Sequence, residues 1–165
     1  MKSTEQAFIK LIKENKGIIY KICNSYCAEK EDRDDLSQEI IYNLWKAFDS
    51  FDEAHKFSTW MYRIALNVAI SFYRQEKKFR NRESITEGLI VFEENMEEKS
   101  EKEGNLQLLQ QFISELKEID KAIILLYLDS KSHREIAEIT GFSETNVATK
   151  INRIKDKLKE KFSSK

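Results

Sequence analysis

Apolar residues recur at intervals of three and four along most of the chain, which is the spacing of one face of an α-helix. Eight windows show this pattern: 8–12, 18–26, 36–48, 57–72, 106–116, 120–128, 132–139 and 143–158. The strict alternation of apolar and polar residues that is typical of a β-strand does not compete in these windows. The pattern therefore predicts an all-α fold.

Few residues interrupt these helices, because the chain has no proline and only four glycines. The predicted helix N-caps are Ser58 or Thr59, Asp120, Ser132 and Ser143. Gly17 is predicted to separate the first two helices, and Gly141 to make a turn between the last two. Gly88 and Gly104 fall in a middle segment of different composition.

That middle segment, residues 81–105, holds 3 basic and 8 acidic residues, whereas residues 1–80 hold 14 and 12 and residues 106–165 hold 11 and 9. Such an acidic stretch, with one apolar island at 89–92, is typical of a flexible tether. A segment of this length can reach about 85 Å at about 3.4 Å per residue. We therefore predict two small helical domains, 1–80 and 106–165, joined by a linker at 81–105.

Several classes of protein are excluded. The longest unbroken apolar run, Ala122 to Leu128, is much shorter than the roughly 20 residues of a membrane span. The chain starts without an apolar signal core, so we expect a cytoplasmic protein. Cys23 and Cys27 are interpreted as small core residues, not as a disulfide or metal ligands. Because no phosphate-binding glycine loop, nucleophile elbow or metal-ligand spacing occurs, we expect neither an enzyme nor a cofactor.

Residues 133–154 have the spacing of a helix-turn-helix, in which Ala137 is small at the helix crossing and Gly141 permits the turn. Val147 and Ile151 would anchor the second helix. Five residues lie on or near its free face, where side chains can contact base edges or phosphates in a major groove: Asn146, Thr149, Lys150, Asn152 and Arg153. A plain helical hairpin with a solvated charged face is the alternative.

The helix predicted at 57–72 continues into a basic stretch and carries a polar stripe of Arg63, Asn67, Ser71 and Arg74. Phe57, Tyr62 and Tyr73 could flank this stripe. Aromatic rings beside cations suit a single-stranded nucleic acid, because bases stack on the rings while the cations neutralise phosphates. Composition alone favours the other interpretation, in which the aromatic residues, Trp60 and Phe72 in particular, belong to the core.

An acidic cluster surrounds the start of the helix predicted at 36–48, and Asp35, Gln38 and Glu39 can share its exposed face. The oxygen spacing and glycine of a calcium loop are absent. Two interpretations remain open. The cluster docks on a basic protein surface, or it only provides acids at a helix N-terminus, where they are favourable.

Three segments in this order carry a family resemblance: DLSQEIIYNLWKAFDSFD at 35–52, FSTWMYRIALNVAISFYRQEKK at 57–78, and the helix-turn-helix. Together they resemble bacterial RNA polymerase sigma factors of the sigma-70 family, and most closely the small two-domain extracytoplasmic-function (ECF) group. The resemblance covers nearly all of both predicted domains and leaves out the linker.

The resemblance implies a mechanism. Asp35, Gln38 and Glu39 would dock on the clamp helices of the largest polymerase subunit. Trp60 and the loop before it, with Arg63, Asn67, Ser71 and Arg74, would capture the melted minus-ten strand. The helix-turn-helix would read the minus-thirty-five duplex, and the linker would thread the polymerase between the two. The implied partners are core RNA polymerase, promoter DNA and an anti-sigma factor, without a small-molecule substrate.

Three positions depart from the family pattern. Ser71 stands where an aspartate is frequent, so roles of that carboxylate do not transfer. The recognition helix reads Thr145 to Ala148 where Gly-Thr-Val followed by Lys or Arg is frequent, which removes one basic DNA contact. Lys117 replaces the usual proline after Leu116. The alternative function is a stand-alone helix-turn-helix regulator with a sensing or dimerising first domain, which would not need the docking face.

Overall fold

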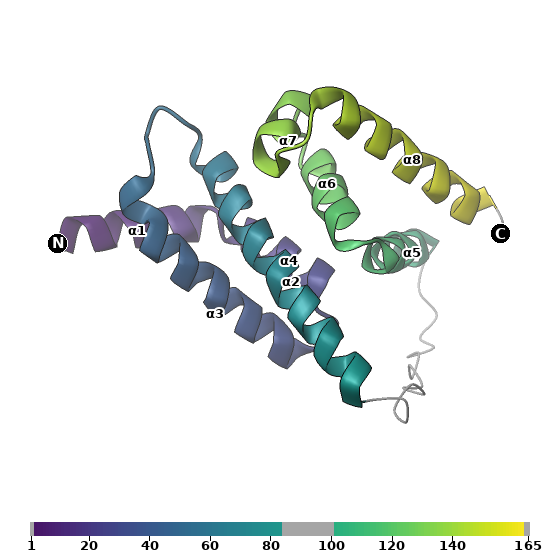
Figure 1. The fold of residues 1–165 in the computed structure, drawn as a ribbon, viewed down its shortest axis with the longest axis horizontal. Coiled ribbons are helices and arrows are strands. Elements are labelled where there is room, and N and C mark those ends of the chain that lie inside the picture. Colours follow the sequence, from purple (N-terminus) through teal and green to yellow (C-terminus); the bar gives the residue numbers. More distant parts are fainter. Residues whose placement is uncertain (1, 84–100, 164–165) are drawn as a thin grey trace.

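The computed structural model describes residues 2–83 and 101–163, in which every regular element is a helix. The first part contains α1 (Lys2–Glu14), α2 (Lys16–Tyr26), α3 (Lys30–Ala47), the 3-10 turn η1 (Phe48–Ser50) and α4 (Phe57–Glu83). The second contains α5 (Glu101–Glu115), α6 (Glu118–Leu128), α7 (His133–Thr140) and α8 (Glu144–Ser163) (Figure 1). The predicted all-α fold is confirmed.

The helices extend three residues from one side and five from the other into the range 81–105 that we assigned to the linker. Gly104 accordingly lies within α5 and not in a tether. The rest of that range, including Gly88 and the apolar island at 89–92, lies outside the described residues.

The N-terminal half is built around α3 and α4, which run side by side in opposite directions with α2 packed against both (Figure 1). Each contributes a stripe of fully buried residues: Leu36, Ile40 and Leu44 from α3, and Met61, Ala65 and Ala69 from α4. These stripes have the three- and four-residue spacing that predicted the helices. The loop between η1 and α4 projects from one end of this pair.

The C-terminal half packs α6, α7 and α8 together, and the helix-turn-helix is formed by α7 and α8. Ser132 caps α7 by accepting a hydrogen bond from the Glu135 N–H, and Ser143 accepts one from the Asn146 N–H. Gly141 ends α7 with a φ of 85°, in the left-handed region that glycine adopts most readily. Both caps and the turn are as predicted.

Three other predicted helix boundaries were wrong. Gly17 lies inside α2, and the break between α1 and α2 is at Asn15, whose side-chain amide and N–H both donate to the Leu11 carbonyl. Helix α6 begins at Glu118, two residues before Asp120, and its N-cap is Lys117, whose carbonyl accepts from the Lys121 N–H. Helix α4 begins at Phe57, so Ser58 and Thr59 lie within its first turn and are not its caps.

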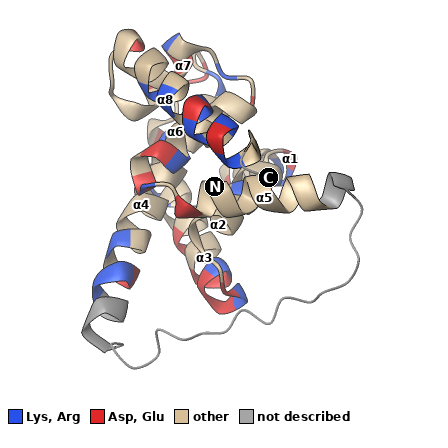
Figure 2. Ribbon diagram, turned by 90° about the vertical axis from the view of Figure 1, so that its right-hand side faces the viewer, with Lys and Arg blue, Asp and Glu red and all other residues tan. Residues whose placement is uncertain are grey.

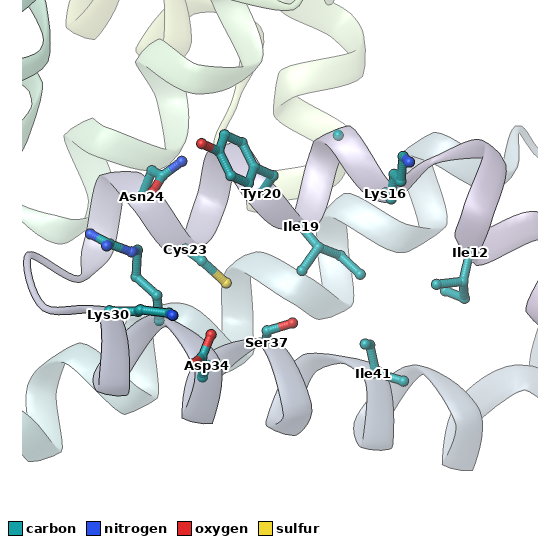
Figure 3. A pocket seen from close by; sticks show the side chains of 12 residues that line it. Ile12, Lys16, Ile19, Tyr20, Cys23, Asn24, Lys30, Asp34, Ser37 and Ile41 are labelled. Carbon is teal, nitrogen blue, oxygen red and sulfur yellow. The ribbon is translucent and has the colours of Figure 1, made fainter.

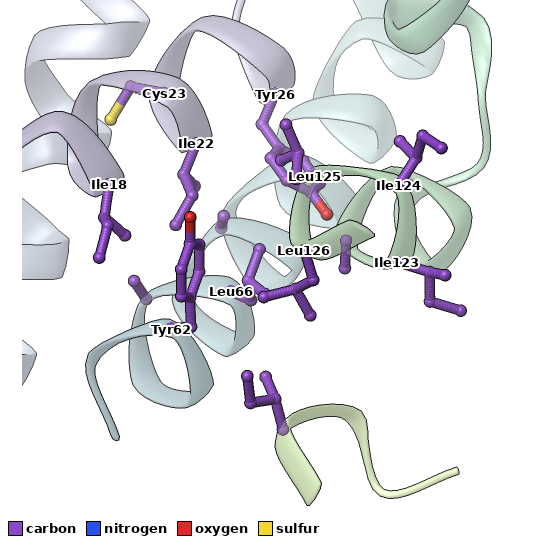
Figure 4. Packing of buried hydrophobic residues seen from close by; sticks show 14 of the residues in the cluster. Ile18, Ile22, Cys23, Tyr26, Tyr62, Leu66, Ile123, Ile124, Leu125 and Leu126 are labelled. Carbon is purple, nitrogen blue, oxygen red and sulfur yellow. The ribbon is translucent and has the colours of Figure 1, made fainter. Parts of the chain in front are cut away.

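The two halves are not separate bodies, because α6 lies against α2 and α4, and α7 against α4. Ile18 and Ile22 of α2, Tyr62 and Leu66 of α4, and Leu126 of α6 are buried in one continuous apolar cluster (Figure 4). Tyr62 and Leu66 were absent from the predicted apolar stripe of this helix. They are buried because α4 has a second packing face, which the C-terminal half covers.

Candidate nucleic-acid and protein interfaces

The polar face predicted on α3 is exposed. Asp35, Gln38 and Glu39 line a hollow of about 460 Å³ together with Tyr42 and Phe72. Figure 2 shows that Asp and Glu residues are frequent along α3 and that Lys and Arg residues gather toward the C-terminal end of α4. The structure thus brings the three predicted residues together on one accessible surface and adds Tyr42, which is 61% exposed.

An apolar surface continues from this hollow. A neighbouring hollow of about 540 Å³ has seven lining residues: Glu5, Phe8, Ile9, Gln38, Ile41, Tyr42 and Trp45. Ile41 and Trp45 were predicted in the core, yet they are 36% and 43% exposed. The sequence contained a signal for this exposure, because Ile40 and Ile41 are neighbours in the chain, as are Leu44 and Trp45. Neighbours on a helix point about 100° apart, so both members of a pair cannot face one narrow core.

The polar stripe on α4 is also on one face. Trp60, Arg63, Asn67, Ser71 and Arg74 fall within about 80° around the helix axis at about 100° per residue. The four polar side chains are exposed, and Trp60 is partly buried. The structure therefore assembles the five residues that the resemblance assigned to the minus-ten strand.

Trp60 is held in place by an aromatic cluster at the base of the loop before α4. Its ring lies 5.2 Å from Phe51, 5.4 Å from Phe57 and 6.3 Å from Phe48, measured between ring centroids. Within the loop, Asp52 accepts hydrogen bonds from two backbone N–H groups that follow it. The loop and the start of the stripe are thereby positioned together, and Trp60 remains partly exposed.

Tyr62 and Tyr73, which we expected beside the stripe, face the C-terminal half instead. Tyr62 is 1% exposed, and its hydroxyl donates to Asp129 Oδ2 at 2.7 Å. Burial, together with that hydrogen bond, raises the pKa of Tyr62 well above its ordinary value. Tyr73 is partly buried against Tyr26. Tyr62 therefore cannot stack on a base in this arrangement, and neither ring flanks the stripe, so that expectation was wrong.

The recognition helix α8 is anchored by Val147, Ile151 and Ile154, which are almost fully buried. Its outer surface carries four of the five predicted residues in exposed positions: Asn146, Thr149, Asn152 and Arg153. Lys150 lies on the flank, partly buried, with Nζ 4.0 Å from Asp120 and 5.3 Å from the centre of the Phe142 ring. The structure thus brings four residues together and turns the fifth toward α6.

A larger cavity, of about 790 Å³, lies between α1, α2 and α3, and Ile41 lines both it and the apolar hollow described above (Figure 3). Cys23 points into it, and both Cys23 and Cys27 are buried and free, as core residues are. Burial raises the pKa of Cys23 to about 11 and that of Cys27 to about 12. Among the described residues, no group of His, Cys, Asp and Glu could hold a metal ion, and no helix could cross a membrane.

Comparison with protein families distinguishes a sigma factor from a stand-alone helix-turn-helix regulator. The model of sigma-70 region 2 matches residues 11–79, and that of sigma-70 region 4 matches residues 106–158. The chain belongs to the sigma-70 family. Region 2 spans the exposed polar faces of α3 and α4, and region 4 spans the helix-turn-helix. A stand-alone regulator is therefore not favoured, and the protein is a promoter-directing sigma factor.

Curated relatives place this sigma factor in the ECF group. It is 31% identical to the ECF RNA polymerase sigma factor SigW of Bacillus subtilis, over 96% of this chain and 90% of the relative. It is 28% identical to the sigma factor SigV of the same organism, over 92% and 88%.

Two solved structures share the fold. The first is CnrH in complex with the cytosolic domain of CnrY, with a TM-score of 0.69 and 22% identity over 97% of this chain and 90% of that one. The second is the sigma factor RpoE in complex with the anti-sigma factor NepR from Bartonella quintana, with a TM-score of 0.67 and 19% identity over 97% and 96%. At these identities the likeness concerns the fold alone.

Proposed function

We propose that this sigma factor divides promoter recognition between its two halves while α3 holds it on core RNA polymerase. The observation that carries the proposal is the placement of two exposed nucleic-acid-type surfaces on two different helices. One is the stripe on α4, and the other is the outer face of α8. A third surface, on α3, has the opposite charge and suits a protein partner.

The α3 surface would bind the clamp helices of the polymerase through Asp35, Gln38 and Glu39. Its acids suit a basic partner, and the adjoining exposed rings of Tyr42 and Trp45 add apolar area. Aromatic residues at the centre of an interface with charges at its rim are typical of a specific protein contact.

The α4 stripe would receive the melted minus-ten strand. Arg63 and Arg74 would neutralise phosphates, and Asn67 and Ser71 can hydrogen-bond to bases that have left the stack. The partly exposed ring of Trp60 offers a stacking surface beside the aromatic cluster. Stacking on an aromatic ring stabilises a base by about 1–3 kcal/mol, which offsets part of the cost of unpairing.

The outer face of α8 would enter the major groove of the minus-thirty-five element. Asn146, Thr149, Asn152 and Arg153 are exposed there. Arg153 can form a bidentate contact with guanine, and Asn152 can form one with adenine. Lys150, on the flank, would hold a backbone phosphate, which positions the helix without reading sequence.

We also propose that the protein acts in the cytoplasm without enzymatic activity of its own and is held inactive by an anti-sigma factor. The two solved sigma factors named above were captured with CnrY and with NepR. Their shared fold supports a partner of the same kind here.

Run-off transcription with core RNA polymerase tests the proposal. The purified chain should confer promoter-specific transcripts, while core enzyme alone should not. Weak duplex binding is expected without polymerase, because each half is only slightly basic. Tight, dimeric operator binding without polymerase, or no specific transcript from any fragment of the source genome, would contradict it.

A further inference from the structure

The cavity between α1, α2 and α3 has a volume of about 790 Å³, which lies within the range of small-molecule sites in proteins. Two of its walls are antiparallel helices, because only three residues separate the end of α2 at Tyr26 from the start of α3 at Lys30. Helix α1 contributes Ile12 (Figure 3). The three residues of α3 that we propose for polymerase docking do not line it, so the cavity is a separate feature of this half.

The lining changes from polar to apolar along the cavity. Lys30 and Asn24 lie at the end where α2 and α3 are joined, whereas Ile12 and Ile41 lie at the other end, with Ser37 between them (Figure 3). From Lys30 to Ile41, α3 rises about 16 Å at about 1.5 Å per residue. The cavity is therefore elongated, with a hydrophilic end and a hydrophobic end.

Basic groups dominate the charge of the lining. Arg33 Nη1 donates to the Ala28 carbonyl at 2.9 Å, which holds the guanidinium in place and leaves its other N–H groups for a ligand. Arg33, Lys30 and Lys16 have no ion pair within the described part of the chain. Asp34 is the single acid among the lining residues, so basic groups outnumber acidic ones three to one. This charge favours an anionic ligand.

The rest of the lining suits an apolar group. Ile19 and Cys23 are 6% and 5% exposed, and the Cys23 thiol points into the cavity. Since burial raises the pKa of Cys23 to about 11, the thiol is an uncharged wall at neutral pH. Ile41 is 36% exposed, and covering it would remove apolar area from water, which is favourable. A purely hydrophilic anion would leave this area uncovered.

We propose that this cavity binds a small anionic amphiphile, with one carboxylate, sulfonate or phosphate head and a short apolar tail. The head would bind Arg33 and Lys30, and the tail would lie against Ile19 and Ile41. The cationic end discriminates against an amphiphile with a positive head, and the apolar end discriminates against an anion without a tail. This site goes beyond the proposed function and does not depend on it.

Isothermal titration calorimetry with decanoate tests the site on the full chain. Decyltrimethylammonium has the same tail with the opposite charge, and acetate has the same head without the tail. We expect decanoate to bind at least tenfold more tightly than either. Equal affinities for the two ten-carbon ligands would show that any exposed apolar surface suffices, and that result would overturn the proposal.

A matched pair of charge reversals tests the role of the cationic end. Lys30→Glu replaces attraction of the head with repulsion, so decanoate should bind about tenfold more weakly. Lys10→Glu makes the same change at an exposed position of α1 that does not line the cavity, and it should keep the wild-type affinity. Urea denaturation shows whether both variants are as stable as the wild type. Equal decanoate affinities in two stable variants would contradict the proposed head contacts.

The two thiols show where the ligand binds. Cys23 lines the cavity, whereas Cys27 lines a different hollow with Phe72 and Tyr73. Decanoate should therefore slow the modification of Cys23 by methyl methanethiosulfonate severalfold and leave the rate at Cys27 unchanged, as measured by tandem mass spectrometry. Decyltrimethylammonium should protect neither thiol. Equal protection of both thiols by decanoate, or of neither, would place the ligand elsewhere and overturn the proposal.

Sedimentation with phosphatidylglycerol vesicles distinguishes a free amphiphile from a lipid within a bilayer. The cavity is proposed for a free molecule, so the chain should stay in the supernatant while decanoate binds. Sedimentation with the vesicles, together with no calorimetric signal from decanoate, would mean that the cationic groups bind a membrane surface instead. That result would also overturn the proposal.

One consequence rests on the proposed function as well. Ile41 lines both the cavity and the apolar hollow beside the docking face, so a tail that covers Ile41 removes apolar area from that hollow. Decanoate should therefore weaken the binding of core polymerase to the wild type severalfold, as measured by fluorescence titration. An unchanged affinity would contradict this link. Failure of the wild type to bind core polymerase at all would contradict the proposed function, while the calorimetric result would stand.

Discussion

At the scale of single residues, the proposed division of labour depends on side chains that do nothing for the fold. Asn67 and Arg153 are both exposed, on α4 and α8 respectively. Their substitution is therefore expected to change DNA binding without changing the free energy of unfolding. This property makes them suitable for separating the two recognition steps.

We predict that Asn67→Ala impairs promoter opening and leaves binding to an upstream duplex unchanged, whereas Arg153→Ala weakens upstream binding. The loss for Arg153→Ala should be about 1–3 kcal/mol if the side chain reads a base. Permanganate footprinting of holoenzyme measures opening, and a gel shift with an upstream duplex measures the second step. Equal losses from both substitutions on the duplex probe would contradict the division.

The same substitution, glycine to alanine, at two positions tests how strongly backbone conformation affects stability. Gly141→Ala forces a side chain into a φ of 85° and should destabilise the protein by about 1–2 kcal/mol. Gly17→Ala lies in α2 with no atom within 4 Å of the added carbon, so it should stabilise by up to about 1 kcal/mol. Urea denaturation measures both. If Gly141→Ala stabilised the protein as Gly17→Ala is expected to, the positive φ at Gly141 would not restrict the side chain at this position.

At the scale of elements, α3 places a buried and an exposed apolar residue only two positions apart. Leu44 is fully buried, whereas Tyr42 is 61% exposed beside the acidic face. The sequence window alone did not distinguish buried from exposed apolar residues here, because Ile41 and Trp45 fit the same broad stripe as Ile40 and Leu44.

Tyr42→Ala should therefore lower the affinity for core polymerase severalfold while it leaves stability within about 0.5 kcal/mol of the wild type. Leu44→Ala should instead cost about 2–5 kcal/mol of stability through the cavity that it leaves. Fluorescence titration with core polymerase and urea denaturation give the two readouts. The assignment of Tyr42 to the docking surface fails if its removal leaves polymerase affinity unchanged.

Helix positions were the most predictable part of the structure. Three- and four-residue spacing located every helical window, and the Ser132, Gly141 and Ser143 signals were correct because local hydrogen bonds and backbone sterics decide them. The helix boundaries predicted at Asp120 and Ser58 were wrong for a reason that is also local. Each lies within the first turn, where a capping type is also tolerated, so the residue type did not give the exact boundary.

At the scale of the whole molecule, the sequence predicted two halves but not their contact. Tyr62, Leu66 and Lys121 were not read as interface residues, because a helix with two packing faces looks like one broad stripe and a buried lysine has no pattern. Which surfaces meet depends on complementarity between segments that are far apart in the chain. Spacing within one helix cannot encode that.

The contacts of Asp129 and Glu118 with the N-terminal half should be sensitive to acid. Burial alone would raise the pKa of Asp129, but hydrogen bonds from Tyr62 and Lys21 and the charges of Lys21 and Lys131 lower it below its ordinary value. The pKa of Glu118 is lowered by its backbone hydrogen bond at the helix start, then by Arg74 and Lys77. Their stabilising contribution is thus fully present above the ordinary values of 3.8 and 4.5, and it is lost as the pH falls through the lowered values.

Stability measured by urea denaturation should consequently decline below about pH 4.5, and Asp129→Asn, which cannot titrate, should flatten that decline. Glu138→Gln, whose ion pair is exposed, serves as the control and should keep the wild-type slope. If stability fell equally with pH in the wild type and in Asp129→Asn, other carboxylates would be responsible for the decline.

The buried thiol of Cys27 provides a chemical measure of how often its surroundings open. With a pKa of about 12, only about one thiol in 10⁵ is ionised at neutral pH, compared with about one in 10² for a solvated cysteine of ordinary pKa 9.0. Each exposure of this residue therefore raises its reactivity toward a disulfide reagent about a thousandfold. Cys27 shares a hollow with Phe72 and Tyr73, so the rate at which it is labelled measures how often α4 moves away from it.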